Sequence, residues 1–146
     1  MERALIELGG IECEVDHCTC MEPIGDLGWS FYIGAAPRDF PGGEHWAPRI
    51  YSENLVIPPR TFAELDGLEV HLSGDWLSLQ AGTGFRIYVV DHLSTHDVSL
   101  TVQKVSSGQY WLDLRGTAEI GWNRKWGTAV PFKVLSPLRF RPHDES

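Results

Sequence analysis

Short β-prone runs, separated by turn signals rich in glycine and polar residues, recur along most of this chain and constrain its fold more than any other feature. From Leu68 onward, runs such as 85–90, 98–105 and 110–115 alternate with turn signals such as 106–108. Strands that recur about every 8–12 residues between turn signals are typical of antiparallel sandwiches and barrels. The sequence therefore predicts an all-β fold, an antiparallel β-sandwich or, as the alternative, a β-barrel.

The N-terminal segment predicts a β-hairpin. Two β-prone runs, Ala4–Leu8 and Ile11–His17, flank Gly9-Gly10, and a Gly-Gly pair supplies the positive φ angles of a tight hairpin turn. Because side chains alternate across a strand, we expect two faces in the second strand. One face holds Ile11, Cys13, Val15 and His17, and the other holds Glu12, Glu14 and Asp16.

Only one segment predicts a helix. Thr61 followed by Glu64 is a capping-box pattern with Gly67 as a stop, so we expect at most one short helix near residues 61–66. Other interruptions predict irregular structure: loops are expected at 19–28, 34–49 and 91–97.

Glycine and proline also divide the C-terminal part of the chain. Gly116 is expected to separate two strands. Pro131 and Pro137 predict that parts of the run 129–140 lie at an edge, or that the run forms two pieces.

Length and composition favour one domain covering residues 1–146. The 146 residues are 42% hydrophobic, and cores divide only beyond about 250 residues. No apolar run approaches the roughly 18 residues needed to cross a bilayer, and the N-terminus does not resemble a secretory signal. We therefore expect no membrane partner.

The three cysteines predict free thiols. Cys13, Cys18 and Cys20 are an odd number within eight residues, which does not suit a disulfide framework and favours a reducing compartment, the cytoplasm. With His17 they also suggest zinc, but on an extended strand Cys13 and His17 point away from the other two. Since tetrahedral zinc needs four converging ligands, free thiols are the preferred interpretation.

Negative charge is concentrated in the first half of the chain. Residues 1–73 carry 13 acidic and 4 basic side chains, whereas 74–146 carry 7 and 8, and the net charge is −8. This balance does not favour nucleic acid, whose binding depends on clustered Lys and Arg. The ridge of Glu12, Glu14 and Asp16 is either a solvated face or a docking surface for a basic partner.

The segment 37–49 combines prolines, charges and Trp46. Trp and Arg are enriched at binding hot spots, so this segment is a candidate partner-binding loop. In the alternative interpretation it is an Ω-like loop whose Phe40 and Trp46 cover the open end of the core.

We therefore predict a non-catalytic, intracellular β-sandwich that binds a protein with a basic surface. In its general character (small, acidic and without catalytic motifs) the chain is similar to bacterial immunity proteins, which implies an inhibitor that neutralises a basic partner such as a toxin. No catalytic residue, metal ligand or cofactor is predicted. The predicted partner contacts are Glu12, Glu14, Asp16, Arg38, Asp39, Glu44, His45, Trp46 and Arg49.

Two alternative functions stay open. A carbohydrate- or small-ligand-binding sandwich would use Trp122, Trp126 or Trp46, since indole rings stack on sugars. A small cupin-like metalloenzyme would be built around His45, His92 and His96.

Overall fold

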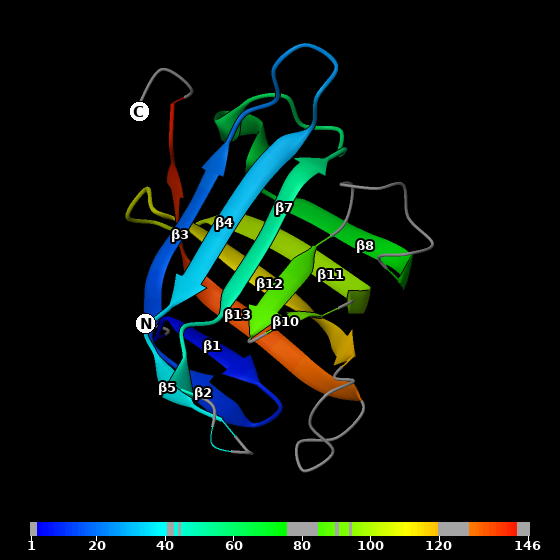
Figure 1. Ribbon diagram of the computed structural model, residues 1–146. Helices are drawn as coiled ribbons and strands as arrows, with labels where there is room; N and C mark the ends of the chain where they lie inside the picture. Colours follow the sequence, from blue (N-terminus) through cyan, green and yellow to red (C-terminus); the bar gives the residue numbers. More distant parts are fainter. Residues whose placement is uncertain are drawn as a thin grey trace.

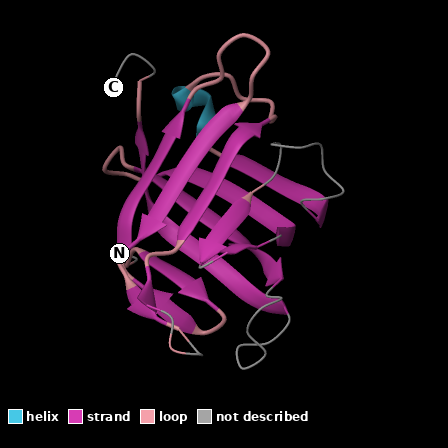
Figure 2. Ribbon diagram, viewed as in Figure 1, coloured by secondary structure: helices cyan, strands magenta, loops and turns pink. Residues whose placement is uncertain are grey.

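The computed structural model describes residues 3–40, 43, 45–75, 85–89, 91–93, 95–119 and 129–142. Most of these residues are in strands, and the one helix among them is a short 3-10 helix (Figures 1 and 2). The elements are β1 (Leu5–Leu8), β2 (Ile11–Cys13), β3 (Val15–Met21), β4 (Trp29–Ala35), β5 (Arg38–Asp39), β6 (His45–Trp46), β7 (Arg49–Leu55), η1 (Phe62–Leu65), β8 (Leu68–Asp75), β9 (Arg86–Val89), β10 (Asp91–Leu93), β11 (Thr95–Lys104), β12 (Tyr110–Glu119) and β13 (Ala129–Phe140).

The main sheet curls into a half-barrel with two layers. Its strand order is β10-β9-β7-β4-β3-β13-β12-β11-β8, and β1 joins it through β13 and carries β2. The layer of β3, β4, β7, β9 and β10 crosses in front of the layer of β13, β12, β11 and β8 (Figure 1). The prediction of an all-β fold is confirmed. The sheet is mixed, because β3 and β13 pair in parallel at Arg139↔Thr19 and Phe140↔Cys20.

One apolar cluster fills the space between the layers. Trp29 and Phe31 of β4 are fully buried, and Phe31 contacts the Phe85 ring with centroids 5.8 Å apart. The indole N–H of Trp29 donates to the carbonyl of Pro59 at 2.7 Å, so the one polar atom of this ring is satisfied. Leu112 and Leu114 belong to the same cluster from the second layer.

The predicted N-terminal hairpin is present, but its second strand is divided. Gly9 and Gly10 have φ angles of 56° and 86°, and Leu8 pairs with Ile11. The strand expected over 11–17 is interrupted at Glu14, where the chain passes from β2 in one layer to β3 in the other. The prediction that residues 11–17 form one strand with two alternating faces is therefore wrong.

The capping box at Thr61 is confirmed. The backbone N–H of Thr61 donates to the Glu64 carboxylate at 3.1 Å, and η1 occupies Phe62–Leu65. Gly67 follows with a φ of 86°, a left-handed conformation that suits glycine.

Three expected loops contain strands. In the loop expected at 19–28, β3 continues to Met21. The short hairpin β5–β6 lies within the loop expected at 34–49. The segment 91–97 was expected to be a polar loop, but β10 and the start of β11 lie there. The sequence did not predict these strands, because the bulge at His96, with Asp97 at a φ of 54°, interrupts the alternation of polar and apolar residues.

Gly116 lies inside one continuous strand, β12, and does not separate two strands. A Cβ at this position would be 2.8 Å from the ring atoms Cε1 and Cζ of Phe132 and 3.1 Å from Val98. Glycine is needed here because neighbouring side chains approach the backbone closely.

The two prolines do not divide β13, but each lies where one side of the strand has no paired neighbour among the described residues. Pro131 and Pro137 pair with β12, whereas β1 pairs only with residues 132–135 and β3 only with 139–140. The missing N–H groups therefore face positions where no strand is paired. The carbonyl of Pro131 accepts a hydrogen bond from Gly9 N–H at 2.8 Å.

Within the described residues, no helix has the length and apolar character required to cross a membrane.

Candidate functional site

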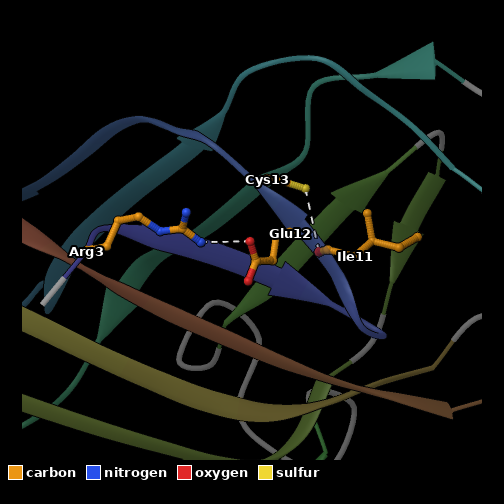
Figure 3. Close-up of polar contacts among 4 residues, drawn as sticks. All are labelled: Arg3, Ile11, Glu12 and Cys13. Carbon is orange, nitrogen blue, oxygen red and sulfur yellow. Dashed lines mark hydrogen bonds and ion pairs between the residues drawn. The ribbon is translucent and has the colours of Figure 1, made fainter.

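The predicted acidic ridge is exposed at one end of the molecule. Glu12, Glu14 and Asp16 are all exposed. Arg3 reaches Glu12, with its guanidinium 2.7 Å from the carboxylate, while Cys13 lies on the opposite side of β2 (Figure 3). Both partners of this ion pair are well exposed, with side-chain accessibilities of 73% and 55%, so the pair contributes little to stability.

The hairpin β5–β6 lies beside this ridge. The N–H of Ala36 donates to the Glu14 carbonyl at 2.9 Å, and Figure 1 places β5 next to β2. Arg38 is close enough to Cys13 to influence the pKa of its thiol. The fold thus brings the ridge and Arg38 together, although 22 residues separate Arg38 from Asp16.

Other residues of the predicted loop divide between exposed and packed positions. Asp39 and His45 are exposed and in contact, with 2.7 Å between Oδ1 and Nδ1. Phe40 is buried, and Trp46 packs edge-on against Tyr88 at 5.5 Å, as the alternative interpretation of the segment expected. Arg49 is exposed on β7. Glu44 lies outside the described residues.

The cysteines are free, buried thiols, as predicted. Burial raises the pKa of Cys18 to about 12. Burial also raises the pKa of Cys20, and the neighbouring Cys18 and Glu22 add to this effect. Burial raises the pKa of Cys13, with partial opposition from the Arg38 guanidinium. These thiols therefore stay protonated at neutral pH.

The four possible zinc ligands do not converge. The imidazole of His17 lies over Gly34 on the outside of β3, whereas Cys18 and Cys20 are buried in the core. Nowhere in the described part of the chain do three or more His, Cys, Asp or Glu side chains gather in a way that could hold a metal ion.

The histidines of the metalloenzyme alternative have separate environments. His96 on β11 lies 3.5 Å from the Glu119 carboxylate, and His45 on β6 contacts Asp39. The side chain of His92 is outside the described structure.

A hollow that the sequence did not predict lies on the outer face of β3 and β4. It encloses about 490 Å³ and is lined by His17, Thr19, Tyr32, Arg139, Phe140 and Arg141. Tyr32 and His17 also line a neighbouring hollow of about 240 Å³ toward Arg49 and Tyr51. Arg139 and Arg141 are two positions apart in the sequence, which places them on one face of an extended chain. This spacing alone does not predict the hollow, because the residues that they meet on β3 are remote in the chain.

A hollow of about 800 Å³ lies on the outer face of the other layer. Trp111 is half-buried beneath it. Polar side chains, among them Gln103 and Asp113, share this surface with Leu135. Trp122 and Trp126, which the carbohydrate alternative used, lie outside the described residues.

Comparison of the chain with protein-family models, curated proteins and solved structures gives no match.

Proposed function

We propose that this protein binds another protein with a basic surface through its acidic end, defined as Glu12, Glu14, Asp16, Arg38 and Asp39. The observation that carries the proposal is the exposure of four carboxylates around the junction of β2, β3 and β5. In this role the protein acts as an intracellular inhibitor of the immunity type, without a reaction of its own.

The electrostatics of the acidic end support a basic partner. Among the described residues of this end, four carboxylates are opposed by two guanidiniums, those of Arg3 and Arg38, and Arg3 contacts Glu12 at 2.7 Å. Like-signed charges on one surface raise the rate of encounter with an oppositely charged partner, and added salt screens this effect.

The backbone at this end also favours a protein partner. Among the described residues β2 pairs only with β1, so Ile11 and Glu12 belong to a short sheet edge. An extended segment of a partner can add to such an edge through main-chain hydrogen bonds, while its basic side chains meet the carboxylates.

The test is affinity capture from the source cells, followed by calorimetry with the purified partner. We expect one stoichiometric partner with a basic binding surface. The variant Glu12→Gln/Glu14→Gln/Asp16→Asn should weaken binding by at least about tenfold, since charge pairs at interfaces are worth about 1.5 kcal/mol or more each.

A matched control removes the same charge elsewhere. Asp26→Asn/Glu53→Gln/Glu69→Gln neutralises three exposed carboxylates away from the acidic end and should bind like the wild type. Equal binding by both triple variants, or no stoichiometric partner, would contradict the proposal.

A second candidate function is supported by the hollow above Trp111. A half-buried indole beside Gln103 and Asp113 combines a stacking surface with hydrogen-bonding groups, a combination typical of small-ligand sites. If this hollow binds a neutral sugar, the sugar should change the tryptophan fluorescence of the wild type but not that of the variant Trp111→Phe. An unchanged wild-type spectrum across a glycan panel would reject this candidate.

A further inference from the structure

The hollow over β3 and β4 gathers positive charge on a protein whose net charge is −8. Two of its six lining residues are arginines, and none is acidic. Both arginines are exposed, and neither forms an ion pair with a carboxylate within the described residues. Two guanidiniums that have no carboxylate partner among the described residues can bind an external anion in the hollow beside them.

The sheet register aligns three of the lining residues. Arg139 pairs with Thr19, and Thr19 pairs with Tyr32, so the three occupy one row across β13, β3 and β4. Paired residues on neighbouring strands have Cβ atoms about 4.5–5.5 Å apart. The row therefore places a guanidinium and two hydroxyl groups along one side of the hollow.

Arg141 and His17 complete the donor set. The backbone N–H of Arg141 donates to the Cys20 carbonyl at 2.8 Å, which keeps the chain extended beside β3. In an extended chain residues i and i+2 share a face, so Arg141 follows Arg139. His17 is two residues from Thr19 on β3, and Asp16 contacts its Nδ1 at 3.2 Å.

The remaining wall of the hollow includes the ring of Tyr32. Phe140 lies between the two arginines, but its ring is on the other side of the strand, against Phe62 of η1, with ring centroids 5.3 Å apart. The volume of about 490 Å³ exceeds what a single phosphate group fills. The Tyr32 ring beside the arginines therefore suits an organic group attached to the anion.

We propose that this hollow, the β3–β4 hollow, binds a phosphate monoester of a small organic molecule. The two guanidiniums and the hydroxyls of Thr19 and Tyr32 contact the phosphate oxygens, and the organic group lies against the Tyr32 ring. A phosphate suits this donor set better than a carboxylate, because it offers three terminal oxygens to donors from three strands. The proposal is independent of protein binding at the acidic end.

The experiment measures binding to the full chain by calorimetry and by ³¹P NMR. Phenyl phosphate is the probe, and inorganic phosphate and benzoate are compared with it. We expect saturable 1:1 binding of phenyl phosphate, weaker binding of inorganic phosphate, which lacks the ring, and still weaker binding of benzoate.

The variant Arg139→Gln/Arg141→Gln should weaken phenyl phosphate binding by at least about tenfold, since it removes charge-assisted hydrogen bonds. Lys104→Gln/Lys133→Gln removes the same charge from the other layer and should bind like the wild type. Thermal unfolding of all variants establishes that they are folded, and the single variant Arg139→Gln provides a second measurement if the double variant is unstable.

Three outcomes of the measurements with phenyl phosphate and benzoate would overturn the proposal. They are the absence of saturable binding at millimolar phenyl phosphate, equal weakening by both double variants, and binding of benzoate as tight as that of phenyl phosphate. Tighter binding of a single-stranded oligonucleotide, lost in Arg139→Gln/Arg141→Gln, would assign the hollow to a nucleic acid instead and overturn it as well.

Discussion

The imidazole of His17 lies directly over Gly34, its pairing partner on β4. A Cβ at Gly34 would overlap Cε1 of the ring and would be 2.7 Å from Nδ1. Because Gly34 has no side chain, the imidazole can occupy this position, where it lines the β3–β4 hollow.

This relationship predicts the behaviour of Gly34→Ala. The new methyl group has to displace the imidazole, which is the far end of a partly exposed side chain, and we expect a loss of about 0.5–1.5 kcal/mol in the free energy of unfolding, the cost of an off-rotamer side chain. Urea denaturation measures it. In the background His17→Ala the same substitution should cost clearly less, and an equal cost in both backgrounds would show that the ring is not the obstacle.

Gly116→Ala should destabilise the protein by overpacking its core. The added methyl group meets the Phe132 ring at 2.8 Å and Val98 at 3.1 Å, so we expect a loss of about 1–3 kcal/mol in urea denaturation. The smaller side chain of Phe132→Leu should recover part of the loss in the double variant. Additive effects of the two substitutions would contradict this contact.

Stability should fall at alkaline pH because of the buried thiols. The pKa of Cys18 is about 12 in the folded protein, against 9.0 for an unperturbed thiol. The unfolded chain therefore loses this proton above pH 9 while the folded protein keeps it, and the free energy of unfolding decreases as pH rises from about 9 toward 12. Below pH 9 the thiol is neutral in both states and has no effect.

Denaturation at pH 8, 9, 10 and 11 measures this dependence. Each unit above pH 9 should cost on the order of 1 kcal/mol per buried thiol. Cys18→Ala should show a shallower decline than the wild type. Identical slopes would mean that Cys18 ionises as readily in the folded protein as in the unfolded chain.

Ser52→Ala should stabilise the protein despite removing a hydroxyl group. Ser52 is buried between Tyr51 and Glu53 on β7, and its Oγ has no hydrogen-bond partner among the described residues. Burying an unpaired hydroxyl costs about 1–3 kcal/mol, so its removal should raise the urea midpoint. The variant Ser136→Ala is the comparison, because the hydroxyl of Ser136 does donate, to the Pro137 carbonyl at 2.9 Å, and it should lose stability.

Features set by neighbouring residues were predictable from the sequence. The turn at Gly9-Gly10 and the capping box at Thr61 depend on contacts within a few positions, and the all-β class follows from a period of two residues. The exposure of Glu12 and the burial of Cys18 also agree with this local reasoning.

Features set by distant pairings were not predictable. The chain passes between the layers at Glu14 because β2 pairs with β1 and β3 pairs with β4 and β13. Pro137 is tolerated within β13 because neither β1 nor β3 pairs with it. The β3–β4 hollow was missed for the same reason, since Arg139 meets Thr19 through a parallel pairing that no local pattern indicates.

The position of β13 has a consequence for biosynthesis. This strand holds β1, β12 and β3 at once, and it is the last of the described strands to leave the ribosome. Until then the edge of β1 that later meets Phe132 and Val134 is unpaired, and the two layers have no shared strand. The nascent protein therefore carries open β edges until residue 140 has left the ribosome, and a chaperone that shields such edges would act in that interval.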